Sequence, residues 1–242
     1  MALCLSLLIG VGACSEEEIA YSAGEENKEV ILQLNCQLQT NQEVIVSRAS
    51  TAENRLNDLH FYVFNAAGEL TGYKKLVATE SSPIPTSGPE TVTVKAITGE
   101  AYIYALANLN STIYYLDDAD KNKLTGIDEA DVAGSSLTRD EFLAIDFKRQ
   151  YGNASHIISP NPTDGQFMMS GYLNGGKAVT ITAGTNGAGV ISESNVIRLY
   201  RILAKNTFTI EAGNGVTFTP STYELHNVAG GGGGWKVGEW YS

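Results

Sequence analysis

Cysteine is scarce in this chain of 242 residues, which contains only three. Cys4 and Cys14 lie near the amino terminus, and Cys36 follows them. All three lie before Arg48, after which a protease site is expected (see below), so a cut there would leave no cysteine in the remaining chain. Disulfide bonds and thiol-ligated metals would then be excluded there, so packing and strand pairing alone would have to stabilise the fold.

Basic residues are few, because 16 lysines and arginines stand against 27 aspartates and glutamates. Residues 1–48 contain seven of the acids and two of the bases, so the rest of the chain keeps 20 acids against 14 bases. Such a surface repels polyanions, and we therefore expect no nucleic acid among the partners.

Motifs for catalysis and cofactor binding are absent from the sequence. It has no G-x-S-x-G, no H-E-x-x-H and no phosphate-binding loop. The three histidines, His60, His156 and His226, lie far apart and form no ligand or triad spacing. We therefore expect no catalytic residue, no metal ligand and no cofactor. His60 flanks an apolar run, for which a structural role is the expectation.

One acidic segment fits part of a calcium-binding loop. Asp118, Asp120, Asn122 and Glu129 match four of its positions. The sharp turn of such a loop needs Gly at the sixth position, where this chain has Lys123. The segment is therefore expected to be a solvated loop without a metal.

Long apolar runs are lacking, and the run Leu3–Val11 is too short to cross a membrane as a helix. It has the length of a signal-peptide core, although no Lys or Arg precedes it. The small residues Gly12 and Ala13 lead directly into Cys14, which is the pattern of a bacterial lipoprotein signal. We expect removal of residues 1–13 and attachment of lipid to the Cys14 thiol.

The residues after Cys14 divide into a polar segment and an alternating one. Ser15–Lys28 contains five glutamates and almost nothing apolar, so we expect a tether. Val30, Leu32 and Leu34 then alternate with polar residues, and this alternation predicts a strand.

A protease site is expected after this strand. Arg48 lies between a β-branched run, which includes Val44 and Val46, and the small residue Ala49. Small residues enter protease subsites easily. A cut between Arg48 and Ala49 would separate the alternating segment from the rest of the chain.

The remaining chain consists of short apolar segments, with turn signals roughly every 8–12 residues, which indicates an antiparallel β-sandwich. The capping-box pattern from Thr138 to Glu141 predicts a helix at about 139–147, and a second is expected near 128–132. A turn is expected at Gly99-Glu100. The expected strands lie at about 59–64, 71–77, 91–97, 101–108, 167–172, 178–182 and 196–205.

Several segments in this order carry a family resemblance. They are the motif at Cys14, the site at Arg48, and residues 59–68, 104–109, 167–171 and 201–205. Together they resemble the fimbrillin family, the type V fimbrial subunits of Bacteroidales. The acidic stretch after Cys14 also resembles the surface-export signal of Bacteroidota lipoproteins. The resemblance implies a transthyretin-like β-sandwich that acts as a structural fibre subunit.

The resemblance further implies a route of assembly. The subunit reaches the surface of the outer membrane as a lipoprotein, and an Arg-specific surface protease cuts it at the site matching Arg48. The lipid and the first strand leave, a strand of a neighbouring fimbrial subunit fills the groove, and an extracellular fimbrium grows. The apolar side chains that would plug the groove before the cut are Val30, Leu32, Leu34, Val44 and Val46.

The same resemblance divides the chain. We expect a signal peptide in 1–13, a propeptide and removable strand in 14–48, an amino-terminal sandwich in 49–205, and the start of an incomplete second sandwich in 206–242.

Two other functions stay open. A lipid-retaining anchor or a tip adhesin for host or bacterial surface ligands would come from the same family, and an anchor should not be cut after Arg48. A surface glycan-binding lipoprotein would show an exposed aromatic platform.

Overall fold

The strands expected from apolar patterns form close to their predicted places. The computed structural model describes residues 27–38, 55–84, 90–109, 114–115, 118–149, 168–201 and 235–236. The fold class is mainly β, as expected, and the described residues include two short α-helices. The strands of the main sheet are β1 (Glu29–Leu38), β2 (Asp58–Asn65), β3 (Leu70–Val77), β4 (Glu90–Ile97), β5 (Gly99–Ala107), β8 (Met169–Tyr172), β9 (Val179–Ala183), β10 (Gly189–Ile191) and β11 (Val196–Arg201).

The sheet is organised around β5, which pairs with β2 along one edge and with β8 and β9 along the other. Its strand order is β10-β9-β5-β8-β11-β1-β4, and β3 joins through β2. The ladders are antiparallel except that between β1 and β11, which is parallel and departs from the expected all-antiparallel arrangement. Three short strands, β6 (Tyr114–Tyr115), β7 (Asp146–Arg149) and β12 (Trp235–Lys236), form a separate sheet in the order β12-β7-β6.

The first of two hydrophobic cores lies where the sheet folds over on itself. Alternate residues of β2, namely Leu59, Phe61 and Val63, point into it and are fully buried. Opposite them lie inward-facing side chains of β1 and β4, so the two halves of the sheet cover each other as the layers of a sandwich do.

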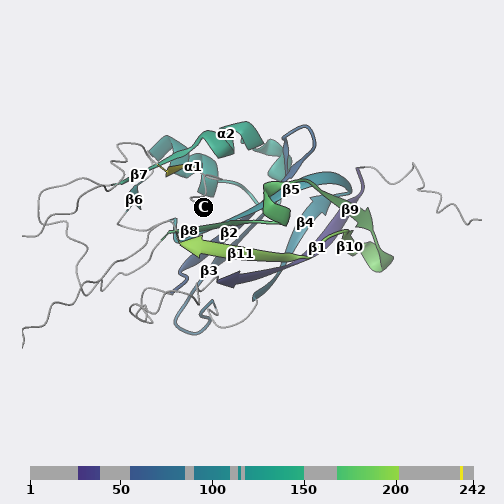
Figure 1. Ribbon diagram of the computed structural model, residues 1–242, viewed down its shortest axis with the longest axis horizontal. Coiled ribbons are helices and arrows are strands. Elements are labelled where there is room, and N and C mark those ends of the chain that lie inside the picture. The colour runs from purple at the N-terminus through teal and green to yellow at the C-terminus, as the bar shows by residue number, and fades with distance from the viewer. Residues whose placement is uncertain are drawn as a thin grey trace, which may run out of the picture.

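The second core lies on the other face of β2, beneath the helices in Figure 1. Phe142 is fully buried there, with its ring centroid 4.8 Å from that of Tyr62 and 5.3 Å from those of Phe64 and Tyr104. Burial raises the pKa of the Tyr62 phenol, which keeps its proton and donates a hydrogen bond to the carbonyl of Leu124 at 2.8 Å. Strand β2 therefore has both faces buried, which explains its nearly continuous apolar sequence.

The predicted capping box is confirmed. Helix α2 (Arg139–Ala144) begins after Thr138, whose hydroxyl accepts from the Glu141 N–H while the Glu141 carboxylate accepts from the Thr138 N–H. The helix ends three residues before the predicted boundary of 147, because the chain turns at Ile145 and enters β7.

The expected helix near 128–132 is wrong, and so is the expected loop around Asp118. Helix α1 covers Asp118–Thr125, whereas the 128–132 segment leads into a single 3₁₀ turn, η1 (Val132–Gly134). Within α1 only Leu124 is buried, so no apolar periodicity revealed this helix. Asp118 and Asp120 lie in its first turn, where carboxylates are favoured by the helix dipole.

The expected turn at Gly99-Glu100 is a corner between strands. Only Thr98 separates β4 from β5, which begins at Gly99 itself. Gly99 has φ +124°, a conformation that side chains rarely adopt, so glycine is needed for the chain to change direction within one residue. The Thr98 backbone and hydroxyl also bind Lys28, which fixes the start of β1 at this corner.

We predict that Phe142→Ala lowers the free energy of unfolding by about 3–5 kcal/mol, because it leaves a cavity beneath α2. The matched variant Phe142→Leu keeps most of the volume and should cost less than about 1.5 kcal/mol. Urea titrations of the two variants measure this difference. Equal losses would contradict the placement of Phe142 in a closely packed core.

Candidate functional site

Strand β1 lies between β4 and β11, and Figure 1 shows it running beside β11 in the lower layer. Eight residue pairs join it to β4 in an antiparallel ladder, from Glu29 opposite Ile97 to Cys36 opposite Glu90. Four pairs join Asn35–Leu38 to β11 in the parallel ladder. A strand at the amino-terminal end of the described chain is thus inserted between two strands that follow it by more than 50 residues.

The two faces of β1 differ sharply in burial. The inward residues Val30, Leu32 and Leu34, predicted as plugs, have at most 1% of their surface exposed. Cys36 and Leu38 continue the same row at 4% and 7% exposure. These two residues were not predicted as plugs, although the alternation that begins at Val30 includes both of them.

Strand β10 begins beside the first half of β1, where Ile31 and Ala188 form an isolated parallel bridge, and a glycine allows this close approach. A Cβ atom on Gly189 of β10 would lie 2.6 Å from Leu32 Cδ2 and 2.9 Å from Val30 Cγ2. Any larger residue would therefore push against the two side chains. The backbone of β10 thus forms part of the wall against which the first half of β1 packs.

The outward face of β1 carries a set of polar contacts at Asn35. The Asn35 side-chain oxygen accepts from Thr91 Oγ1 at 2.8 Å, and its amide nitrogen donates to Asn195 Oδ1 at 3.2 Å. The Asn35 backbone N–H donates to the Asn195 carbonyl at 2.9 Å, and the Asn195 amide donates to the carbonyl of Gln33 at 3.1 Å. These contacts tie β1 to both neighbouring strands at one point.

Strand β4 depends on β1 for its ladder hydrogen bonds. Within the part of the chain that the structure describes, β1 is the only strand with which β4 forms a ladder. Without β1, one edge of β4 and the facing edge of β11 would present unpaired N–H and C=O groups beside exposed apolar side chains. Such an edge is a template for pairing with another strand.

Other predicted site residues lie outside the described residues. They are the lipid site Cys14, the plugs Val44 and Val46, and the cleavage site Arg48–Ala49. His156 and His226 lie there too. These assignments remain predictions.

His60 has structural surroundings. Its side chain is fully buried, with Nδ1 2.8 Å from the Tyr73 hydroxyl and Nε2 3.3 Å from Asp58 Oδ1. Burial, together with the charges of Glu129 and Asp58, raises the pKa of Tyr73. The cluster is closed off beneath the helices, which agrees with the structural role expected for His60.

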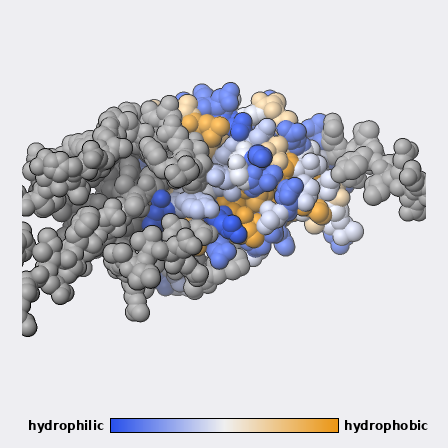
Figure 2. All heavy atoms as spheres, viewed as in Figure 1, coloured by the Kyte–Doolittle hydropathy of each residue, from blue (hydrophilic) through white to orange (hydrophobic). Residues whose placement is uncertain are grey.

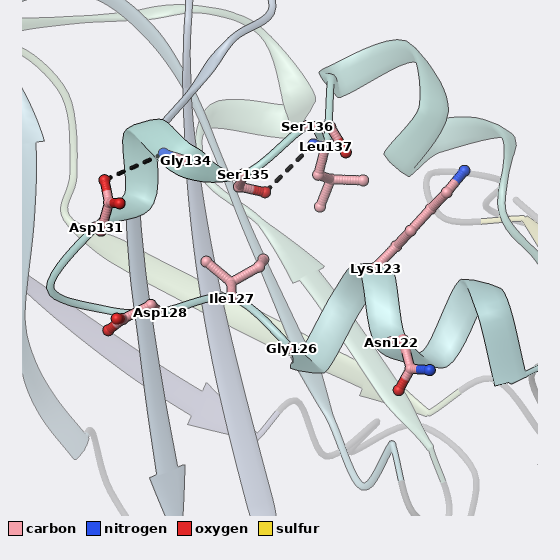
Figure 3. Close-up of a pocket in the computed structure, with 10 residues that line it drawn as sticks. All are labelled: Asn122, Lys123, Gly126, Ile127, Asp128, Asp131, Gly134, Ser135, Ser136 and Leu137. Atoms are coloured by element: carbon pink, nitrogen blue, oxygen red, sulfur yellow. Dashed lines mark hydrogen bonds between the residues drawn. The ribbon is translucent and has the colours of Figure 1, made fainter.

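A surface cavity of about 330 Å³ lies between α1 and the η1 turn (Figure 3). Its polar groups mostly stabilise the turns around it: Asp131 Oδ1 accepts from the Gly134 N–H, and Ser135 Oγ accepts from the Leu137 N–H. These groups show no catalytic arrangement.

Glu129 matches a calcium-loop position in the sequence together with Asp118, but its carboxylate instead accepts hydrogen bonds from Lys74 Nζ and the Lys75 N–H, each at 2.8 Å.

The described residues show three further features. No group of three or more His, Cys, Asp or Glu is placed to hold a metal ion. No helix there is long and apolar enough to span a membrane. The exposed large apolar side chains there are Ile31, Val77 and Val190, none of them aromatic, and hydrophilic and hydrophobic residues are interspersed on the face that Figure 2 shows.

Fold and site together define a β-sandwich protein in which the first described strand is inserted between two later ones. A family model described as major fimbrial subunit protein (FimA) matches residues 33–217. The chain therefore belongs to the FimA family of fimbrial subunits. Proteins of this family are structural components of cell-surface appendages and assemble with other fimbrial components.

Several solved structures are similar to the chain. The tip fimbrial protein Mfa3 of Porphyromonas gingivalis, with a C-terminal truncation, matches with a TM-score of 0.40 and 16% identity over 72% of this chain and 49% of that one. The fimbrial anchor protein Mfa2 of the same organism matches with a TM-score of 0.39 and 14% identity over 70% of this chain and 49% of that one. A fimbrilin (fimA) of Porphyromonas gingivalis matches with a TM-score of 0.38 and 13% identity over 74% of this chain and 40% of that one. The chain thus spans about half or less of these structures, and no curated protein matches it.

We predict that two substitutions on β1 differ widely in effect. Leu34→Ala should lower the free energy of unfolding of the uncut protein by about 2–5 kcal/mol, because it leaves a cavity in the first core. Ile31→Ala, on the outward face at 40% exposure, should change it by less than about 1 kcal/mol. Guanidinium titrations compare the two, and similar losses would contradict the inward and outward assignment.

The ion pair of Glu129 with Lys74 predicts a pH dependence. Burial alone would raise the pKa of Glu129, but hydrogen bonds from Lys74 and Lys75 and the charge of Lys74 lower it below its ordinary value of 4.5. The stabilisation is therefore complete above pH 4.5 and disappears as the pH falls through the lowered pKa.

The variant Glu129→Gln should have a free energy of unfolding roughly 0.2–1 kcal/mol lower than the wild type at pH 7, the range for a partly exposed ion pair. This difference in the free energy of unfolding should shrink below pH 4. Urea titrations at pH 7 and pH 3 measure both. A difference that grows in acid would show that the pKa is raised instead.

Proposed function

We propose that this protein is a structural subunit of a fimbria that polymerises by strand exchange at the groove occupied by β1. One observation carries the proposal: β1 buries a row of five side chains between β4 and β11, yet it precedes Arg48 in sequence. A single cut after Arg48 would therefore turn an internal strand of the sheet into a separate chain.

Maturation begins at the membrane in this proposal. Residues 1–13 direct export, Cys14 receives lipid, and the chain reaches the outer surface of the outer membrane. An Arg-specific protease there cuts between Arg48 and Ala49. The sandwich of residues 49–205 and the residues 206–242 then continue without the lipid, as part of an extracellular fimbrium.

Burial energy keeps β1 in place before the cut. Each fully buried Val or Leu contributes about 1.5–3 kcal/mol, so Val30, Leu32, Leu34 and Leu38 together contribute roughly 6–12 kcal/mol. The uncut protein therefore presents no open groove, which prevents early polymerisation.

The cut changes the competition for the groove and does not by itself empty it. While β1 is covalently attached, its effective concentration at the groove is on the order of millimolar or higher. After the cut that advantage is lost, and a strand from another subunit with similar burial displaces β1. Backbone pairing with β4 and β11 holds the new strand, as in other cases of strand addition.

Amino-terminal sequencing of surface-shed protein tests the processing step. We predict that the wild type begins at Ala49 and forms polymers, whereas Arg48→Ala remains lipidated, uncut and monomeric. Arg55→Ala removes the next arginine and is the matched control, which should be cut and polymerise normally. A wild-type protein that keeps Cys14 lipid and is never cut would contradict the proposal and support a membrane anchor or a surface-binding lipoprotein.

A further inference from the structure

We infer that the β1 groove selects its incoming strand by direction and by one polar residue. The strand that fits runs parallel to β11 and carries an asparagine where Asn35 now lies. The occupant is an extended segment of another subunit of the same fimbria. This inference rests on the proposed function and specifies the partner of the same groove.

Asn195, the residue directly before β11, forms hydrogen bonds that fit only one direction of the incoming strand. In a parallel ladder one residue bonds to two residues of its neighbour, whereas in an antiparallel ladder it exchanges both bonds with a single opposite residue. Asn195 accepts from the Asn35 N–H through its backbone carbonyl and donates to the Gln33 carbonyl through its side-chain amide. Its side chain thus extends the parallel ladder by one rung, and a reversed strand would not present that pair of groups.

The side chain of the asparagine forms hydrogen bonds with residues on both sides of the groove. Thr91 on β4 donates to the Asn35 side-chain oxygen, and Asn195 beside β11 accepts from the Asn35 amide nitrogen. An amide offers an acceptor and a donor at once. An ionised aspartate has no donor for Asn195, a lysine has no acceptor for Thr91, and an apolar residue has neither.

The inward positions add a size requirement. Val30 and Leu32 pack so closely on Gly189 that a Cβ atom there would lie 2.9 Å and 2.6 Å from them, so side chains of about their size fit at these two positions. The fitting strand therefore has five alternating apolar residues, with the asparagine between the third and the fourth. Gln37, outward and exposed opposite Arg198, lacks the two-walled setting and serves as the control position.

The test uses the full chain after cutting at Arg48 and synthetic strands of the sequence Glu29–Leu38, with Cys36→Ala in each to prevent oxidation. Four peptides are compared: the parent, Asn35→Leu, Gln37→Leu, and the parent with its residue order reversed. Each is added in excess, and mass spectrometry quantifies the released amino-terminal fragment. Dilution of the loaded protein then gives the rate at which each peptide leaves.

We expect the Asn35→Leu peptide to leave roughly tenfold faster than the parent, because two hydrogen bonds are lost. The Gln37→Leu peptide should leave at the parent rate, and the reversed peptide should not be retained. In protein carrying Asn195→Ala, or Thr91→Val as a milder second variant, the tenfold difference should shrink to about threefold or less.

Equal retention of the parent and Asn35→Leu peptides in wild-type protein would overturn this inference and leave the proposed function standing. Equal retention of the reversed peptide would overturn the selection by direction. If no peptide enters and the amino-terminal fragment never leaves, the groove itself is refuted, and both the inference and the proposed function fail.

Discussion

The pairing of β1 with β4 on one side and β11 on the other is the contact on which the architecture depends. Among the described strands it alone connects β4 to the sheet by hydrogen bonds. It also supplies one row of the first core, five side chains that face Leu59, Phe61 and Val63 across the sandwich. A strand with so many contacts would normally be a permanent part of the fold, and its position before the proposed cut at Arg48 is what gives it a functional meaning in the proposal.

The second core explains how the molecule could lose that strand and remain folded. No residue of β1 belongs to the described part of this core, which is built from β2, β3, β5 and the helical segments. Phe142 and the tyrosines around it pack independently of the groove. One face of the central sheet is thus covered without β1, while the covering of the other face includes β1.

Sequence patterns predicted the strands well because alternation and apolar runs report directly on burial. Val30, Leu32 and Leu34 were assigned to a strand with one buried face, and the Thr138–Glu141 capping box located α2. The resemblance implied that this strand fills a groove, but its partners β4 and β11 could not be predicted, since register and partner choice arise from contacts between segments far apart in sequence. Asn35 and Asn195 gave no signal for the same reason, being 160 residues apart. Helix α1 was not predicted because it has only one buried residue, Leu124, and therefore no apolar periodicity.

The most direct test of the account is a disulfide that locks β1 onto β4. Gln33 and Thr93 are opposite each other and face outward, and cross-strand partners lie about 4.5–5.5 Å apart between Cα atoms, within the range for a disulfide. The Gln33→Cys/Thr93→Cys protein, once oxidised, should be cut after Arg48 but should not polymerise until a reductant is added. The Gln33→Cys single variant should polymerise under both conditions. Polymerisation of the oxidised double variant at the wild-type rate, with the disulfide intact, would show that β1 does not have to leave.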